Sequence, residues 1–284
     1  MSMRDIFVPM FQQAECGPQL DVAARLAPRL GAAVNAVFTR PDSVMAVAAI
    51  PDMLVAAGVV LQSIDKDGQA AQHSAHAQFD AWRAANGLTG SAGVDDVDIA
   101  ATWHERVGPA SNTVVEIGRV SDLIVVARPD PNEAITDEVF TAAIYGTGRP
   151  TLIAPDRLVD DPLGHVMIAW NGSLQASRAV AAAMPLLKLA QQVSVFGMPV
   201  REGELRRDLG LIEHLSRHDI DAECVGPSED TGDVGAQLLD TAHREGATMI
   251  VMGAYTHSRV RESFLGGVTH YILKHAQICV VMAH

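Results

Sequence analysis

The sequence lacks the features of a membrane protein, a disulfide-bonded protein or a nucleic-acid-binding protein. No apolar run reaches the ~20 residues that span a bilayer. The three cysteines, Cys16, Cys224 and Cys279, lie in separate segments, so we expect no disulfide framework. Acidic residues outnumber basic ones by 34 to 21, and the net charge of −13 argues against nucleic acid or an anionic membrane as partners. The first ten residues hold no apolar signal core, so we expect a cytoplasmic protein.

Signatures of enzymatic and metal chemistry are equally scarce. The sequence contains neither a G-x-S-x-G nucleophile turn nor a G-x4-G-K-[ST] phosphate loop. His214 and His218 lie four residues apart, and His73 and His76 lie three apart, but no cysteine or carboxylate completes either pair as a metal site. We therefore assign no catalytic residues and no metal ligands.

Aliphatic residues and chain length define the fold class. Apolar residues make up 48% of the chain, but aromatic residues only 5%, so the core is built from Ala, Val, Leu and Ile. This composition is typical of helices packed on a buried parallel sheet. At 284 residues, the chain is longer than one average domain, so we expect two.

An internal repeat supports two copies of one unit. Residues 122–128 (DLIVVAR) resemble residues 248–254 (TMIVMGA), 126 residues later. Residues 4–10 (RDIFVPM) resemble residues 165–171 (HVMIAWN), at an offset of 161. The larger offset at the start means that the first copy carries about 35 extra residues, so we predict domains at residues 1–156 and 164–284.

The extra residues form an insertion at about residues 41–76 of the first domain. Its first part is rich in Ala, Val and Met and is interrupted by Pro51, Gly58 and Gly68. These breaks predict one or two short helices rather than a third domain. Residues 156–164, acidic with Pro162, have the composition of a linker between the two domains.

Strands and helices alternate regularly in the second copy. This order predicts a parallel sheet with helices on both faces, in which ligands bind beyond the carboxyl ends of the strands. Loops that follow Trp170, Met198 and Met252 emerge at that edge. The predicted strands are residues 165–170, 192–198, 221–225, 248–252 and 278–282, and the predicted helices are residues 174–190, 202–218 and 234–245, with a last helix before the final strand.

The last 37 residues carry the most specific motif. An apolar strand is followed by Gly253, a polar loop, and Gly266 and Gly267, which we expect to open a helix that ends near His275. Glycine allows a phosphate to approach the backbone closely, and the free N–H groups of a first helical turn favour an anion. The segment therefore has the geometry of an anion site.

The same residues resemble the C-terminal signature of the universal stress protein family, G-x2-G-x9-G-[ST]. Gly253 matches the first glycine and Gly266 the third, whereas Thr256 replaces the second glycine and Gly267 the Ser or Thr. The resemblance implies an α/β fold of two tandem, doubly wound parallel-sheet domains, Rossmann-like and similar to adenine-nucleotide α-hydrolases. It also implies an internal pseudo-dimer in which residues 150–154 meet residues 278–282, with homodimerisation as an open addition.

For the second copy, the resemblance implies an adenine-nucleotide site, with ATP as the typical ligand and Mg²⁺ as its companion. Backbone N–H groups near the last helix would contact the phosphates, and Asn171 stands where the family usually has an aspartate that contacts adenosine. The cofactor-binding candidates are Asn171, Met198, Gly253, Thr256, Arg259, Gly266, Gly267 and Val268. Two alternatives stay open: Asn171 and Ser173 can simply form a turn and helix cap, and the glycines can serve turns and packing.

We expect the first copy not to bind a nucleotide. Its fourth strand runs into Arg128-Pro129, where no glycine follows at the required spacing and Pro129 offers no N–H. Before its last helix, Asp137 and Glu138 replace the glycines of the second copy, and two carboxylates there would repel phosphate.

Two main functions follow from this reading. The first is a stress-response protein with one adenine-nucleotide site in the second domain. The second is a degenerate, nucleotide-free scaffold that binds a protein partner or a small ligand through residues 44–61. Slow ATP hydrolysis, which some members of the family show, is a third hypothesis without a dedicated catalytic base in this sequence.

Overall fold

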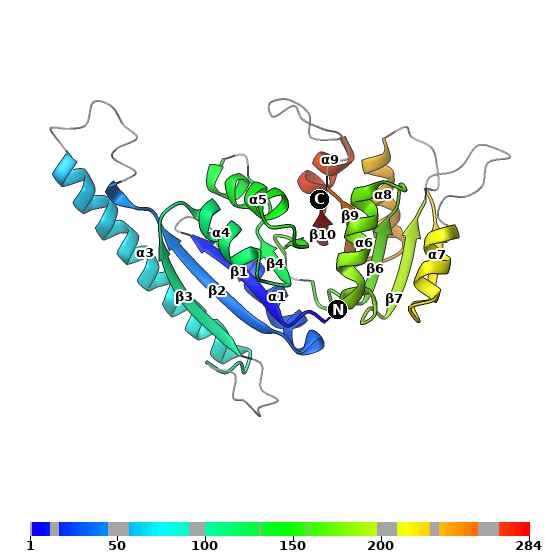
Figure 1. Ribbon diagram of the computed structural model, residues 1–284, viewed down its shortest axis with the longest axis horizontal. Helices are drawn as coiled ribbons and strands as arrows, with labels where there is room; N and C mark the ends of the chain where they lie inside the picture. Colours follow the sequence, from blue (N-terminus) through cyan, green and yellow to red (C-terminus); the bar gives the residue numbers. More distant parts are fainter. Residues whose placement is uncertain are drawn as a thin grey trace. The chain divides into compact units, whose positions relative to one another are not determined.

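The chain forms two compact α/β units. The N-terminal unit is Arg4–Thr147, and the C-terminal unit comprises Met1–Met3 and Gly148–His284 (Figure 1). The computed structural model describes residues 2–11, 17–44, 57–90, 100–130, 132–157, 159–197, 209–227, 233–254 and 267–284.

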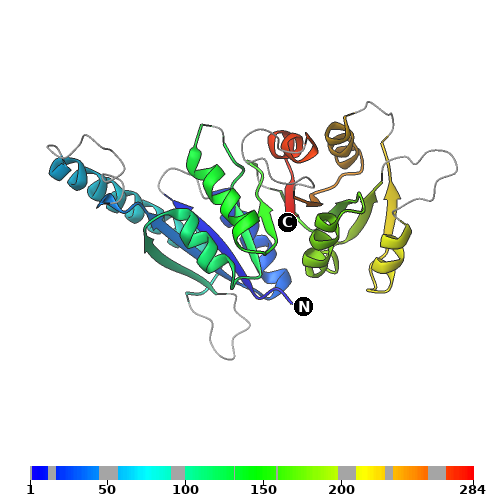
Figure 2. The same cartoon turned by 45° about the horizontal axis from the view of Figure 1, so that its top comes forward.

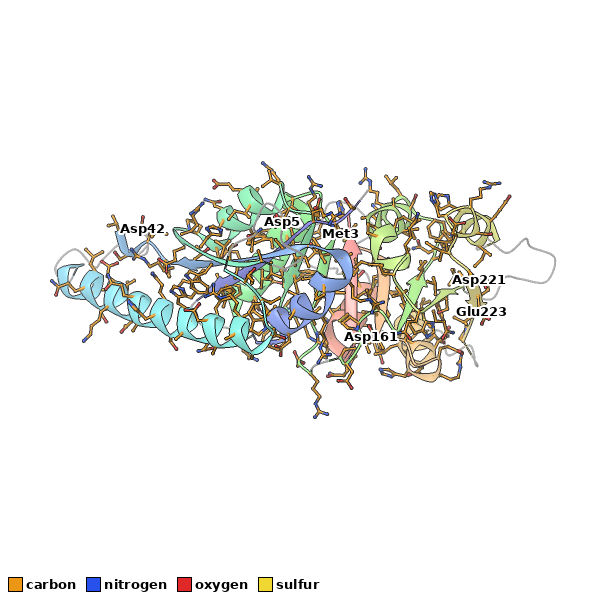
Figure 3. All side chains as sticks on the ribbon, turned by 90° about the horizontal axis from the view of Figure 1, so that it is seen from below. Met3, Asp5, Asp42, Asp161, Asp221 and Glu223 are labelled. Carbon is orange, nitrogen blue, oxygen red and sulfur yellow. The ribbon has the colours of Figure 1, made fainter. Side chains whose placement is uncertain are left out.

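The N-terminal unit is a parallel sheet with strand order β3-β2-β1-β4. Helices α4 and α5 cover one face, and α1 and α3 cover the other (Figures 1 and 3). In chain order, its elements are β1 (Asp5–Phe11), α1 (Gly17–Leu30), β2 (Ala33–Arg40), α3 (Ala57–Ala85), β3 (Ala101–Val107), α4 (Ala110–Gly118), β4 (Leu123–Val126) and α5 (Ala134–Gly146).

The C-terminal unit has strand order β5-β10-β9-β6-β7-β8. All pairs are parallel except β5–β10, and α6 and α7 lie on the opposite face from α8 and α9 (Figure 3). Its elements are β5 (Thr151–Ile153), β6 (His165–Ala169), α6 (Leu174–Leu187), β7 (Gln192–Phe196), α7 (Leu209–Ser216), β8 (Ala222–Val225), α8 (Val234–Arg244), β9 (Met249–Gly253), α9 (Gly267–His275) and β10 (Cys279–Ala283). The predicted α/β class with doubly wound parallel sheets is confirmed.

The last strand, β10, is enclosed between two other strands of the C-terminal unit. It pairs in parallel with β9 and antiparallel with β5, where Val281 lies opposite Leu152. The predicted meeting of residues 150–154 with residues 278–282 is thereby confirmed. All five residues of β10 are buried, and burial raises the pKa of the Cys279 thiol to about 12, so this cysteine is an unreactive core residue.

Local signals set the helix boundaries of the C-terminal unit. Helix α8 starts after Asp233, whose carboxylate accepts hydrogen bonds from the N–H groups of Gly235 (2.9 Å) and Ala236 (3.1 Å). Predicted and observed boundaries agree closely: residues 234–245 were expected for this helix and Val234–Arg244 are helical. The helix predicted at residues 202–218 is observed from Leu209, because residues 198–208 lie outside the described ranges.

The prediction of short helices is wrong for residues 57–76 of the insertion, whereas residues 45–56 lie outside the described ranges. A single helix of 29 residues, α3, runs from Ala57 to Ala85 alongside β2 and β3 (Figures 1 and 2). A glycine inside a helix costs only about 1 kcal/mol relative to alanine, so Gly58 and Gly68 do not interrupt a segment otherwise rich in Ala and Gln. Pro51 lies outside the described residues. Within the described ranges, no helix combines the length and apolarity needed to cross a membrane.

The two units share their strand register. Ile6 pairs with Leu123 in one unit, and Val166 pairs with Met249 in the other, so the first strands correspond at an offset of 160 residues (166 minus 6) rather than the predicted 161. Asp5 thus corresponds to His165.

The residue before the fourth strand anchors the first strand in both units. Asp122 Oδ2 accepts hydrogen bonds from the N–H groups of Arg4 (2.8 Å) and Asp5 (3.2 Å). Thr248 Oγ1 accepts one from the N–H of His165 (3.1 Å). The N–H of Asp5 and that of its counterpart His165 are therefore satisfied by a carboxylate in one unit and by a hydroxyl in the other.

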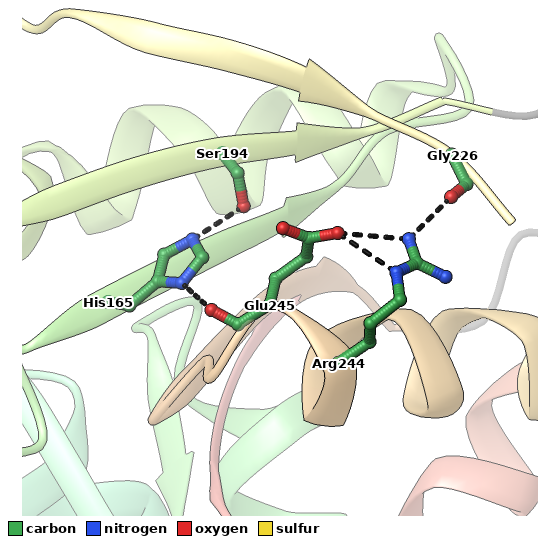
Figure 4. A network of polar contacts seen from close by, with 5 residues as sticks. All are labelled: His165, Ser194, Gly226, Arg244 and Glu245. Atoms are coloured by element: carbon green, nitrogen blue, oxygen red, sulfur yellow. Dashed lines mark hydrogen bonds and ion pairs between the residues drawn. The ribbon is translucent and has the colours of Figure 1, made fainter. Parts of the chain in front are cut away.

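His165 is a buried structural side chain. Its Nδ1 donates to the carbonyl oxygen of Glu245 (2.9 Å), and its Nε2 lies 2.8 Å from Ser194 Oγ (Figure 4). Arg244 extends this network from α8 to the carbonyl oxygen of Gly226 (2.9 Å). Because Ser194 is only 1% exposed, its hydroxyl cannot reach a substrate, and the Ser–His pair ties β6 and β7 to the end of α8.

Asp5 occupies the same position in the N-terminal unit. It accepts a hydrogen bond from the side-chain amide of Asn35, which in turn accepts one from the Thr102 hydroxyl. Desolvation by burial raises the pKa of Asp5, although hydrogen bonds from Asn35 and Ser121 partly oppose that shift. The charged form of Asp5 is therefore less favourable in the folded chain than in the unfolded chain.

Replacing Asp5 by asparagine is expected to stabilise the N-terminal unit at neutral pH. A raised carboxyl pKa means that the protonated form favours folding below the unfolded pKa of about 3.9, and that this contribution is lost as the pH rises through the folded pKa. Asp5→Asn imitates the protonated form and keeps an acceptor for Asn35. We expect Tm to rise by a few degrees at pH 7 and the gain to vanish near pH 4.

Thermal unfolding at both pH values measures this difference. Asp240→Asn is the matched control, because Asp240 is exposed on α8 and loses the same charge. A gain for Asp5→Asn that is the same at both pH values would contradict the account.

Candidate functional site

The candidate site lies at the switch point of the C-terminal sheet. Strands β6 and β9 are neighbours, but the helices that follow them, α6 and α9, cover opposite faces (Figure 3). Ligands of such sheets bind where neighbouring connections diverge, beyond the carboxyl ends of the strands. Here those ends are Ala169 and Gly253.

The loop after β6 is a turn that caps α6. Gly172 adopts a φ of +74°, and the Oδ1 atom of Asn171 accepts a hydrogen bond from the N–H of Ser173 (3.0 Å). Ser173 Oγ accepts one from the N–H of Ala176 (3.1 Å). The alternative prediction of a turn and helix cap is thus confirmed. Asn171 is exposed and also carries two amide N–H donors, so its contact with adenosine stays a prediction.

Gly253 has a packing role that needs no ligand. A Cβ atom at this position would lie 2.6 Å from both the Ala176 nitrogen and the Gln175 carbonyl carbon. The first turn of α6 therefore rests directly on the end of β9, an approach that only glycine allows. This contact also brings the first-turn N–H groups of Leu174 and Gln175 to the switch point. These two residues were not among the predicted site residues. The helix cap at Ser173 could have indicated them, because a cap marks where a helix begins.

The first turn of α9 supplies a second set of donors. Gly267 opens the helix and His275 ends it, as predicted. The N–H groups of Gly267 and Val268 have no acceptor within the helix, because the first turn of any helix lacks them. Since β9 and β10 are parallel, the connecting helix must begin at the edge of the sheet where β9 ends. Gly267 is exposed, and a Cβ there would meet no atom within 4 Å.

Four of the eight predicted cofactor-binding residues lie within the described part of the chain. Asn171, Gly253, Gly267 and Val268 belong to the loops and helix ends at this edge of the sheet. The other four candidates, Met198, Thr256, Arg259 and Gly266, lie outside the described residues.

The corresponding region of the N-terminal unit is built differently. Helix α5 begins at Ala134, so Asp137 and Glu138 lie inside the helix. The prediction that these two residues precede the helix is therefore wrong. Glu138 Oε1 accepts a hydrogen bond from the N–H of Ser111 (3.3 Å), at the start of α4. The extra turn arises because residues 134–136 are themselves good helix formers or neutral, and Thr136 bonds back to Glu133.

Gly253→Ala and Gly267→Ala are expected to differ sharply in stability. The added methyl group clashes with the α6 backbone at Gly253, and overpacking of this kind costs roughly 1–3 kcal/mol. At Gly267 the methyl group enters open space in a helix, so we expect a change within about 0.5 kcal/mol. Chemical denaturation without any nucleotide measures both. Equal stability of the two variants would show that α6 does not rest on Gly253.

Comparisons with known proteins agree with the fold of both units. A universal stress protein from Archaeoglobus fulgidus is 15% identical, with a TM-score of 0.68, and the match covers 99% of this chain and 96% of that one. A putative universal stress protein from Pseudomonas aeruginosa is 13% identical, with a TM-score of 0.54, over 99% and 93%. The cytoplasmic domain of a prokaryotic cation chloride cotransporter is 11% identical, with a TM-score of 0.50, over 99% and 95%.

At such identities the structural likeness establishes the fold, and the cotransporter domain shows that this fold also occurs in another functional setting. No curated protein is significantly similar in sequence. Residues 163–284 match the sequence profile of the universal stress protein family, in the segment that contains the switch point and the signature glycines. Residues 163–284 therefore form a domain of the universal stress protein family.

Proposed function

We propose that this chain acts in a stress response and binds one adenine nucleotide, with ATP as the reference ligand, in its C-terminal unit. Family membership of residues 163–284 supports the stress-response role. The signature glycines occur in the second predicted domain, residues 164–284, and not in the first, residues 1–156, so the proposal places the nucleotide in the second.

One observation carries the proposal: two helix N-termini open at the same switch point. Contact with Gly253 holds the first turn of α6 at the end of β9, and α9 begins at Gly267 on the same edge of the sheet. Unpaired N–H groups and the helix dipole make such ends favourable for phosphate. In this proposal, Gly267 and Val268 donate to the phosphates, together with Gly266 and Arg259 of the signature loop.

The adenosine part would lie at the ends of β6 and β7. Asn171 is exposed there and offers its amide N–H groups to the base or the ribose, while its Oδ1 atom holds the turn. Met198 would contact the base from the loop after β7, and Thr256 would border the ribose. Mg²⁺ would bind through the phosphates of the nucleotide rather than through a protein cage.

A nucleotide-free scaffold is the second candidate, and the packing of Gly253 favours it. Because the α6 backbone alone requires a glycine at this position, the first signature glycine can persist without a ligand. Under this alternative, the chain binds a protein partner or a small molecule instead, and residues 44–61 are the proposed contact surface.

Gly267→Asp is expected to abolish nucleotide binding without unfolding the protein. The added carboxylate would face the phosphates, whereas its side chain enters open space and suits a helix N-terminus. For the wild-type chain, isothermal titration with Mg-ATP should give one site with a dissociation constant on the order of micromolar. We expect Gly267→Asp to weaken it at least about a hundredfold.

Gly267→Ala is the matched control and should bind like the wild type, with Mg-GTP as the control for the base. Binding to Gly267→Asp with unchanged affinity would place the nucleotide elsewhere. No heat from the wild-type chain, together with an unchanged Tm in Mg-ATP, would favour the scaffold.

A further inference from the structure

The N-terminal unit contains a groove that the proposed nucleotide site does not use. It has a volume of about 520 Å³ and lies where β2 and β3 end, beneath α3. The switch point of this unit lies instead between β1 and β4, so the groove is displaced toward the β3 edge of the sheet. Its lining residues are Arg40, Gln69, Gln72, His73, Glu105, Arg106 and Val107.

Strand register and the long helix assemble this lining. Arg40, the last residue of β2, pairs with Val107, the last residue of β3. Gly68 of α3 lies over Arg40, since a Cβ on this glycine would come within 3.9 Å of the Arg40 Cβ. Residues 69, 72 and 73 then share one helical face, which α3 lays along the groove. The long helix α3 thus forms one wall of the groove.

An aromatic cluster packs between α3 and β3 next to the groove. The His76 ring stacks on Trp103 at 4.8 Å between centroids, with an interplanar angle of 1°, and Phe79 packs against the same indole. The Trp103 N–H donates to Glu105 Oε1 (3.0 Å). This hydrogen bond holds the pKa of Glu105 below its usual range, so its carboxylate is ionised at neutral pH.

The charges of the lining favour an anion that also carries hydroxyl groups. Arg40 forms an ion pair with Asp65 (3.6 Å), and Arg106 donates one N–H to the carbonyl oxygen of Glu105 (3.0 Å), so each guanidinium has further N–H donors. Each guanidinium has five N–H donors and matches the geometry of a phosphate or carboxylate. Gln69, Gln72 and Glu105 supply the donors and acceptors that suit hydroxyl groups.

We propose that this groove binds a small hydroxyl-bearing oxyanion, of the sugar-phosphate class. Arg40 and Arg106 would hold the phosphate, while Glu105 and the two glutamines would bind the hydroxyl groups. Among the described residues, no Phe, Tyr or Trp side chain lines the groove, so the proposed ligand differs from the nucleotide of the C-terminal unit.

Glucose 6-phosphate is the probe, and isothermal titration of the full chain is the measurement. The Trp170→Phe variant adds a local signal, because its two remaining tryptophans, Trp82 and Trp103, lie in the N-terminal unit. We expect saturable binding at millimolar concentration or below, a change in tryptophan emission, and at least about tenfold weaker binding of glucose. Absence of binding at 10 mM, or equal binding of inorganic phosphate, would overturn the proposal; the latter would mean that the hydroxyl groups are not recognised.

Arg40→Gln and Arg106→Gln locate the site. Each should weaken glucose 6-phosphate binding at least about tenfold, because each removes charge-assisted hydrogen bonds. Arg217→Gln is the charge-matched control, since Arg217 has a side chain that is 71% exposed in the other unit. Unchanged affinity in both groove variants, with Tm values equal to the wild type, would overturn the assignment to this groove. Mg-ATP binding should be unaffected, so this test and that of the nucleotide site fail independently.

Discussion

The buried strand β10 is the constraint on which the C-terminal unit depends. It pairs with β9 on one side and with β5 on the other, and each of its residues is buried. Pairing with β10 fixes β9 in register, and β9 ends at Gly253, where α6 rests. The position of the candidate site therefore follows from core packing several residues away rather than from the site residues themselves. Pairing with β10 also stabilises the short strand β5, which is only three residues long.

Both units use one scaffold with different chemistry at equivalent positions. Asp5 and His165 occupy the same place in the first strand, and Asp122 and Thr248 satisfy the backbone at its start. Near the carboxyl ends, the units diverge: one presents the opening turns of α6 and α9, and the other presents carboxylates within α5 and a basic groove beneath α3. A duplicated fold can keep its core interactions while its loops and helix ends acquire separate ligands.

Much of the fold was predictable because its signals are local. Apolar strands, the Ser173 cap and the opening glycine of α9 determine their elements from neighbouring residues alone. Helix α3 was not predictable, because whether Gly68 breaks a helix depends on packing against β2 and β3. Strand β3 was not predicted, because four of its residues are exposed and its sequence shows no apolar pattern. The role of Gly253 was ambiguous for the same reason, since its tight neighbour, α6, lies some 80 residues away in sequence.

The central claim is that a nucleotide binds at the switch point between β6 and β9. Amide NMR spectra of isotope-labelled chain during titration with Mg-ATP test it most directly, because they report each N–H separately. The account predicts large shifts for Gly267, Val268 and the Asn171 side chain, and none in the groove residues of α3. Shifts confined to the N-terminal unit, or no shifts at saturating nucleotide, would contradict it.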